Sequence, residues 1–275
     1  MTTQSSSQRF AVFLQRLEER HLADLRFSEV TRALRALSSA YVERRETALV
    51  DHKALDGAGK RAAFAMYYGP IHFLLVQHIV RELGHRLTPI GHRLISVVPD
   101  RGTVVDLGCG TGVAGAAVAT AGSAEAETRP SPGEVGPLKV VGIDTHPWTL
   151  DEARFTYKAF GLTSDVRRGH ASRTRFPADT SFVVAAFVVN ELKEADRAVL
   201  LREFIRLKAD TTRVLIVEPI SNRISPWWPE WVAALGGRAD EWKVRIDLPP
   251  LVKKLAKAAG LRPEALTARS LLVLG

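Results

Sequence analysis

Residues 104–112 have the sequence Val104-Val105-Asp106-Leu107-Gly108-Cys109-Gly110-Thr111-Gly112. A short apolar run ends in an acidic residue, and glycines then alternate with other residues. A stretch rich in small apolar residues, Val113–Ala121, follows directly. This order predicts a buried strand over 103–107, a glycine turn and a helix over 113–121. Because glycine has no side chain, such a turn lets a ligand approach the backbone closely.

The turn also matches the glycine pattern of dinucleotide-binding proteins, since Gly110, Gly112 and Gly115 have the required spacing. Asp106 argues against that ligand, because its negative charge would oppose a pyrophosphate at the N-terminus of the following helix. The same carboxylate suits a ligand that carries positive charge. The turn therefore favours a cationic ligand over a dinucleotide.

The part of the chain before the glycine turn has helical periodicity without strand alternation. Helices are predicted there over 10–25, 28–41, 61–68 and 71–83. Ser28 is expected to cap the second helix, and Pro70 to start the last one. These residues predict an N-terminal helical region, 1–98, on the substrate side of a second domain, 99–275.

The second part of the chain alternates strands with helices. Beyond the first strand and helix, strands are predicted over 139–144, 165–169, 182–189 and 213–218, helices over 148–160, 194–207 and 251–259, and a final apolar segment over 270–274. Such alternation implies a parallel-dominated α/β sheet with helices on both faces. Gly122–Leu138, rich in proline and glycine, is expected to be an exposed loop without a function.

The segment Asp106-Leu-Gly-Cys-Gly-Thr-Gly112 resembles the first motif of class I S-adenosylmethionine (SAM)-dependent methyltransferases. The resemblance covers roughly residues 100–275 and implies a Rossmann-like fold, with SAM as cofactor at the carboxyl ends of the strands. It places an acid and glycines around the amino-acid end of SAM, which carries an ammonium and a sulfonium. It also implies that Asp144, at the end of Val140–Asp144, accepts both ribose hydroxyls.

The resemblance extends to further cofactor contacts. Trp148 lies where a bulky residue often borders the adenine, although a core position explains it equally well. Gly169-His170-Ala171 is similar to a Gly-Asp-Ala segment whose acid often accepts from the adenine amino group. His170 accepts only if it is neutral and correctly oriented, and the backbone is the alternative. Cys109 is expected to fill space beside the cofactor. The cofactor-binding candidates are Asp106, Gly108, Cys109, Gly110, Thr111, Gly112, Asp144, Thr145, Trp148, His170, Ala171 and Phe187.

Methyl transfer from SAM mainly requires alignment of the acceptor, and a general base helps only if the acceptor arrives protonated. Related methyltransferases often carry a polar residue and Glu-Leu after the fourth strand, where this chain has Asn190-Glu191-Leu192. Asn190 and Glu191 are therefore the candidate catalytic residues. In the alternative interpretation, Glu191 begins and caps the next helix. The histidines and acids show no metal-ligand spacing, so no metal is predicted.

A weaker likeness exists to the methyltransferase-like family associated with assembly of the small ribosomal subunit. It rests on Tyr67, Tyr68 and Pro70, on Val188–Leu192 and on Val217-Glu218-Pro219. The chain departs from that family in having no cysteine cluster, which excludes its iron–sulfur site, and no glycine after Pro219. The likeness implies a second hypothesis, a SAM-binding but catalytically weak or inactive RNA-associated assembly factor. Tyr67 and Tyr68 are candidates either for the acceptor pocket or for the core.

Composition bears on three further properties, namely RNA binding, the redox compartment and membrane association. The chain has 275 residues and a formal net charge of +8, with 38 Lys+Arg against 30 Asp+Glu. This excess is compatible with RNA as acceptor or partner, but the basic residues are scattered and arginine-rich, as in proteins of GC-rich genomes. A single cysteine excludes an intramolecular disulfide and fits a reducing compartment. The longest apolar run, Phe182–Val189, is too short to span a membrane, so a soluble cytoplasmic protein is expected. The acceptor and the oligomeric state are not predicted.

Overall fold

The computed structural model describes residues 5–43, 55–87, 97–127, 138–262 and 265–275. Its contacts divide the chain into two compact units. The first comprises Met1–His72 and Lys243–Leu266, and the second comprises Phe73–Trp242 and Thr267–Gly275. This division differs from a boundary after residue 98, because residues from Phe73 onward group with the second unit and a late segment groups with the first.

The elements follow one another in the order expected for an N-terminal helical region before an α/β sheet. In the first part of the chain the helices are α1 (Ser6–Leu22), α2 (Phe27–Glu43), α3 (Ala58–Ala63), a π-helical turn (Phe64–Tyr68) and α4 (Gly69–Arg86). The strands are β1 (Thr103–Leu107), β2 (Lys139–Asp144), β3 (Thr163–Arg168), β4 (Thr180–Ala186), β5 (Arg213–Glu218), β6 (Arg238–Val244) and β7 (Leu266–Val273). The later helices are α5 (Val113–Glu127), α6 (Pro147–Ala159), α7 (Glu194–Ala209), α8 (Trp228–Leu235) and α9 (Pro250–Ala259), with 3₁₀ turns at Ala171–Arg173 and Val189–Glu191.

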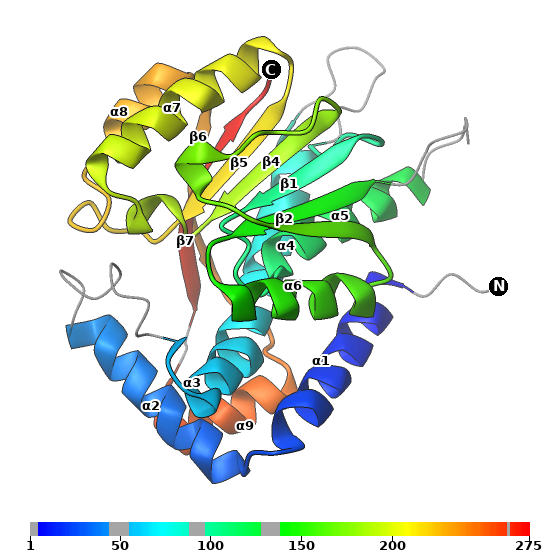
Figure 1. Cartoon of the computed structure of the whole chain (residues 1–275), viewed down its shortest axis with the longest axis vertical. Coiled ribbons are helices and arrows are strands. Elements are labelled where there is room, and N and C mark those ends of the chain that lie inside the picture. Colours follow the sequence, from blue (N-terminus) through cyan, green and yellow to red (C-terminus); the bar gives the residue numbers. More distant parts are fainter. Residues whose placement is uncertain (1–4, 44–54, 88–96, 128–137, 263–264) are drawn as a thin grey trace. The chain divides into compact units, whose positions relative to one another are not determined.

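The sheet has seven strands in the order β3-β2-β1-β4-β5-β7-β6 (Figure 1). Strands β3, β2, β1, β4 and β5 are parallel, and β7 runs antiparallel to β5. The strand order reverses between β1 and β4, so the connections leave a crevice at the carboxyl ends of these strands, where ligands of such sheets bind. The predicted α/β class, with a parallel-dominated Rossmann-like sheet, is confirmed.

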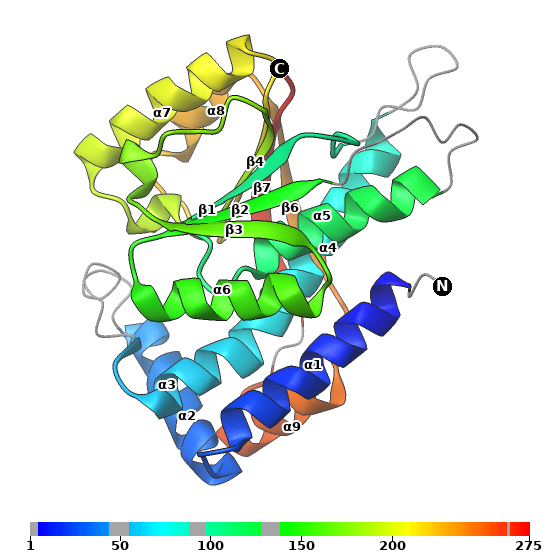
Figure 2. The same cartoon turned by 45° about the vertical axis from the view of Figure 1, so that its right-hand side comes forward.

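Helices cover both faces of the sheet. Helices α5 and α6, with the part of α4 from Phe73 onward, lie on one face, and α7 and α8 lie on the other (Figure 2). Phe73 and Phe160 stack at 4.8 Å between ring centroids on the first face. On the second face, Phe204 of α7 and Trp231 of α8 meet edge to face at 5.9 Å. Because both faces are covered, the central strands β1 and β5 are buried along almost their whole length, and most of their residues are apolar.

The first unit is built from helices. Helix α2 packs on α3 and α9, and the Arg35 guanidinium donates to the Ala258 carbonyl. The prediction that Ser28 caps α2 is wrong, because α2 begins at Phe27 and the Glu29 carboxylate instead accepts from the Arg26 backbone N–H. Pro70 does not start a separate helix, since α3, the π-helical turn and α4 follow one another without a break. A proline cannot donate to the preceding turn, and the widened turn lies directly before it.

That continuous helix, Ala58–Arg86, is the one helix in the described part of the chain that is long and apolar enough to cross a membrane. About two thirds of its most apolar window, 67%, is buried inside the protein. A buried core helix passes the same length and composition test, so this helix is weak evidence for a membrane span.

Two segments differ from the predicted pattern in the second half of the chain. Helix α5 continues to Glu127, so the first residues of the expected loop over Gly122–Leu138 are helical, and its residues 128–137 lie outside the described part. The segment rich in proline and tryptophan, for which no element was predicted, forms α8 and then β6. Pro229 lies in the first turn of α8, where its missing N–H breaks no helical bond.

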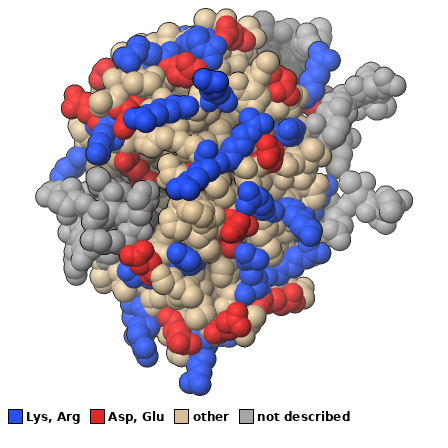
Figure 3. Space-filling view, viewed as in Figure 1, with Lys and Arg blue, Asp and Glu red and all other residues tan. Residues whose placement is uncertain are grey.

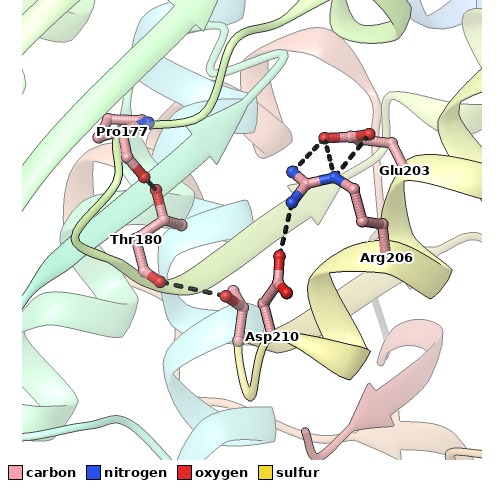
Figure 4. A network of polar contacts seen from close by, with 6 residues as sticks. Pro177, Thr180, Glu203, Arg206 and Asp210 are labelled. Carbon is pink, nitrogen blue, oxygen red and sulfur yellow. Dashed lines mark hydrogen bonds and ion pairs between the residues drawn. The ribbon is translucent and has the colours of Figure 1, made fainter.

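The amino-terminal edge of the sheet has its own polar network (Figure 4). Thr180, at the start of β4, donates its hydroxyl to the Pro177 carbonyl at 2.6 Å. Near the end of α7, Arg206 bridges Glu203 and Asp210, with both contacts at 2.5 Å. The Thr212 hydroxyl, in the turn from α7 into β5, donates to the Thr180 carbonyl at 3.1 Å and so joins this turn to the start of β4, at the opposite edge from the strand ends described next.

Candidate functional site

Two acidic residues lie at the carboxyl ends of adjacent strands. Asp106 is the fourth residue of β1, and Asp144 is the last residue of β2. The strands are parallel with Asp106 opposite Gly142, so both carboxyl groups lie at the same edge of the sheet. The chain leaves β1 through the glycine turn at this edge.

The glycine turn requires backbone conformations that other residues rarely adopt. Gly108, Gly110 and Gly112 all have positive φ angles, between 50° and 77°. A Cβ on Gly108 would lie 2.2 Å from Val188 Cγ2, whereas a Cβ on Gly110 would meet no protein atom within 4 Å. Gly108 is thus required for packing, and Gly110 presents bare backbone to open space. Thr111, between Gly110 and Gly112, is buried.

Asp106 is almost completely buried, with 1% of its surface exposed. Its Oδ2 accepts from the Gly115 backbone N–H and from the Tyr157 hydroxyl, each at 2.8 Å. The pKa of Asp106 is raised to about 7, mainly by burial and to a smaller extent by the nearby charge of Asp144, while the two hydrogen bonds oppose the shift. A positively charged ligand would favour the ionised form of this carboxyl group.

Asp144 connects the end of β2 to the glycine turn through hydrogen bonds. Its Oδ2 accepts from the Gly110 N–H at 3.0 Å, and its Oδ1 accepts from the His146 N–H at 2.9 Å. The Cys109 N–H donates to the Ile143 carbonyl at 3.0 Å beside these bonds. These hydrogen bonds therefore join the glycine turn after β1 to the end of β2, and the half-buried carboxylate of Asp144 lies where the two meet.

The Cys109 side chain lies inside the turn and is 5% exposed. A Cβ on Gly142 would approach its sulfur to 3.1 Å, so the thiol packs against the β2 backbone. Burial raises the pKa of this thiol well above its usual value, and the charges of Asp106 and Asp144 act in the same direction. The thiol is therefore kept protonated, which suits a packing role and not a nucleophile.

The candidates that follow β2 lie at the start of α6. Thr145 is half-buried directly after Asp144, and Trp148 is half-buried in the first turn of the helix. The His146 ring caps this helix by accepting from the Trp148 N–H at 3.2 Å, and the two rings meet edge to face. This cap fixes the start of α6 close to the Asp144 carboxylate.

His170 and Ala171 follow β3, the strand beside β2. The Gly169 N–H donates to the Asp144 carbonyl at 3.0 Å, which brings this segment to the same edge as the two acids. Ala171 is buried in the core, whereas His170 is partly exposed. His170 Nδ1 lies 2.9 Å from the Ser172 hydroxyl, which in turn donates to Asp196 at 2.6 Å.

The end of β4 is held by a buried carboxylate on β5. Glu218 Oε1 accepts from the Val189 N–H at 2.8 Å, and its Oε2 accepts from the Asn190 side-chain amide at 2.6 Å. The Trp227 indole N–H donates to Asn190 Oδ1 at 2.9 Å. Phe187, just before this segment, has a φ of 61° and donates its N–H to the Val217 carbonyl. Both ends of the Asn190 amide are thus fixed by protein groups.

Glu191 does not begin the next helix, because α7 starts at Glu194 after Lys193 as its N-cap. The expectation that Glu191 caps this helix is therefore wrong, and the residue ends the 3₁₀ turn after β4. Its side chain is accessible to water, although surrounding protein and the charge of Asp144 raise its pKa to about 8. Because the charge of Asp144 contributes to this shift, Glu191 lies within electrostatic range of that carboxylate.

Sequence reasoning missed the role of Glu218, which is 0% exposed. Burial raises its pKa to about 8, Glu191 adds to the shift, and Arg269 on β7 opposes it. Arg269 lies opposite Glu218 in the sheet register, and its guanidinium stacks 4.4 Å from the Trp228 ring centroid. The sequence signal that could have identified Glu218 is an acid at the end of a predicted strand, which is the position that Asp144 has in β2.

Tyr67 and Tyr68 belong to the first unit, so their predicted place in an acceptor pocket stays a prediction. Tyr67 is buried, and the Tyr68 hydroxyl lies 3.3 Å from that of Ser38. Within the described residues, no group of three or more His, Cys, Asp or Glu side chains is arranged to hold a metal ion.

No protein-family model matches the sequence, and no curated protein is significantly similar to it. Solved structures are similar in fold. The citrinin polyketide synthase CMeT domain aligns with a TM-score of 0.52 at 15% identity, over 99% of this chain and 70% of that one. A SAM-dependent methyltransferase from Aquifex aeolicus aligns with a TM-score of 0.46 at 15% identity, over 75% and 93%. A tRNA (uracil-54, C5)-methyltransferase from Pyrococcus abyssi, in complex with S-adenosyl-L-homocysteine, aligns with a TM-score of 0.42 at 12% identity, over 73% and 38%.

Proposed function

We propose that this chain, whose fold is that of the class I SAM-dependent methyltransferases, binds SAM and transfers its methyl group to an acceptor. One observation carries the proposal. The acids Asp106 and Asp144 end neighbouring parallel strands on either side of a glycine turn, and Asp144 is bonded to the turn through the Gly110 N–H. Fold alone does not define a function, but the chemistry of these residues supports this one.

The charge of the site suits SAM. Burial is the main cause of the raised pKa of Asp106 and of Glu191, and repulsion by the Asp144 carboxylate raises both further. A ligand with an ammonium and a sulfonium would offset that repulsion. A pyrophosphate would increase it, so the same groups disfavour a dinucleotide.

The shape of the glycine turn fits the same ligand. Open space above Gly110 leaves backbone that a cofactor can approach, and the half-buried Asp144 carboxylate beside it has two oxygens for two vicinal ribose hydroxyls. We propose that Trp148 borders the adenine from the start of α6. His170, at the end of the neighbouring strand, is proposed to contact the adenine amino group.

SAM supplies an activated methyl group, so the residues around the acceptor mainly need to align it. We propose that Asn190 helps to align the acceptor. Glu218 and Trp227 hold its side-chain amide, and Glu218 also accepts from the backbone N–H of Val189 before it. Glu191 is next in the chain and accessible to water. Its raised pKa suits a group that takes a proton from the acceptor.

The acceptor class is left open between a small molecule, a protein and RNA. The net charge of +8 does not decide it, because Lys and Arg are distributed over the visible face with Asp and Glu among them (Figure 3). Incubation of the protein with SAM radiolabelled in the methyl group and with fractionated cell extract would identify the acceptor. We expect label in one fraction, and less of it with Asp144→Ala.

The control for this experiment is a carboxylate variant outside the site. Asp151→Asn removes the exposed partner of Arg154 on α6 and is expected to transfer label like the wild type. If the wild type binds SAM but labels no fraction, the proposal of an active enzyme is overturned in favour of a binding module.

A further inference from the structure

Ser172 lies between His170 and Asp196. Its hydroxyl oxygen is 2.6 Å from Asp196 Oδ1 and 2.9 Å from His170 Nδ1. The 3₁₀ turn that contains Ser172 packs on α7, whose first turn contains Asp196. All three side chains are partly buried. The arrangement connects a carboxylate to one nitrogen of the His170 ring through a single hydroxyl.

Counting protons across this connection assigns the histidine tautomer. An ionised carboxylate only accepts hydrogen bonds, so the single hydroxyl proton of Ser172 must point to Asp196. The Ser172 oxygen can then only accept from His170. In a neutral ring, the proton therefore lies on Nδ1, and Nε2 keeps its lone pair.

One contact favours the opposite tautomer. The Ser172 backbone N–H lies 3.4 Å from His170 Nδ1, and it could donate there only if Nδ1 carried a lone pair. That lone pair would then face the lone pairs of the Ser172 hydroxyl at 2.9 Å. Since the hydroxyl contact is the shorter and stronger of the two, it decides the tautomer.

We propose that Asp196 and Ser172 are positioning residues that hold His170 with its proton on Nδ1, so that Nε2 accepts a hydrogen bond from the 6-amino group of the cofactor's adenine. This inference rests on the proposed function. His170 follows Gly169, whose backbone N–H donates to the Asp144 carbonyl, so the His170 backbone lies at the same edge of the sheet as the proposed ribose-binding acid. With the proton on Nε2 instead, two donors would face each other.

The tautomer can be measured without any cofactor. In ¹⁵N-detected NMR of the histidine rings, with His170→Gln to assign the signal, the neutral ring should show a protonated Nδ1 and an unprotonated Nε2. Ser172→Ala removes the hydroxyl and leaves only the backbone N–H beside Nδ1, so the tautomer should reverse. Ser172→Thr keeps a hydroxyl and should retain it. An unprotonated Nδ1 in the wild-type ring would overturn the inference.

A binding experiment tests the use of this tautomer. The ligands are S-adenosylhomocysteine and its analogue with hydrogen in place of the 6-amino group. The wild type and Ser172→Thr should prefer the parent ligand by roughly three- to tenfold, as expected for one hydrogen bond, and Ser172→Ala should lose most of this preference. Equal binding of both ligands by the wild type would overturn this inference and leave the proposed function intact. Binding of neither would overturn the proposed function and, with it, the role of His170.

Discussion

The Tyr157 hydroxyl donates to Asp106 Oδ2 across 2.8 Å, beneath the glycine turn. The Tyr157 side chain is completely buried, and Cβ atoms built on Gly112 and Gly142 would lie 3.0 Å from its Cε1 and 2.8 Å from its hydroxyl oxygen. Helix α6 thus contacts the motif acid and two glycines with one side chain. This contact makes the charge state of Asp106 dependent on a residue 51 positions further along the chain.

Replacement of this tyrosine by phenylalanine should change the pH dependence of the site. The Tyr157 hydrogen bond lowers the pKa of Asp106, so Tyr157→Phe should raise it above its present value of about 7. We expect SAM binding to require a higher pH in the variant, and the free energy of unfolding to fall by about 1 kcal/mol. Calorimetric titrations from about pH 6 to about pH 9 test this. Superimposable pH profiles would show that the hydroxyl does not act on Asp106.

Asp106 should couple stability and binding to pH in opposite directions. Its folded-state pKa is raised from 3.8 to about 7, so the folded protein binds more protons than the unfolded chain between these values. The free energy of unfolding should therefore fall as pH rises through this window, and Glu218 should extend the fall to about pH 8. Cationic SAM favours the ionised carboxylate, so its affinity should rise over the same range.

The variant Asp106→Asn separates these two effects. It should bind SAM at least roughly tenfold more weakly, as expected when a charged hydrogen bond is lost, and its affinity should change less with pH than that of the wild type. Its melting temperature should vary less between about pH 5 and about pH 8 than that of the wild type, because one buried titrating group is gone. A SAM affinity equal to that of the wild type at high pH would remove Asp106 from the binding site.

Two glycines in the same turn offer a matched comparison. A methyl group at Gly108 would overlap Val188, so Gly108→Ala should destabilise the fold by about 2–4 kcal/mol, including the cost of the positive φ. Gly110→Ala meets no protein atom and should cost only about 1–2 kcal/mol for its conformation. Its methyl group would instead occupy space proposed for the cofactor. Chemical denaturation and SAM titration should show the larger stability loss for Gly108→Ala and a loss of affinity for Gly110→Ala that exceeds its stability effect.

Asn190→Ala should reduce methyl transfer more than cofactor binding. The substitution removes one partner each from the buried Glu218 carboxylate and the Trp227 indole, so a destabilisation of about 1–3 kcal/mol is expected. Thermal melts measure this loss, and single-turnover methyl transfer measured below the melting transition tests alignment. A variant that is destabilised but transfers at the wild-type rate would limit Asn190 to a structural role.

Local patterns were sufficient to predict the strands that carry the site. The runs before Asp106 and Asp144 are short, apolar and closed by an acid, and β1, β2 and β5 have the predicted bounds. The antiparallel β7 was not predictable from its own residues, because strand direction depends on a partner about 50 residues away in the chain. Glu218 and Tyr157 were missed for the same reason, since their contacts with Val189 and Asp106 form only in the folded chain. The segment that forms α8 was obscured by Pro226 and Pro229.

The most direct test of the proposed cofactor is calorimetry of the wild-type protein with SAM, S-adenosylhomocysteine and NAD, repeated with Asp144→Ala. We expect both sulfur compounds to bind and NAD not to bind. Asp144→Ala should weaken the binding of both sulfur compounds by roughly tenfold or more, because the charged hydrogen bonds to the ribose are lost. Binding of NAD with neither sulfur compound would contradict the cofactor assignment, and an unchanged affinity of Asp144→Ala for SAM would contradict the assignment of its carboxylate to the ribose.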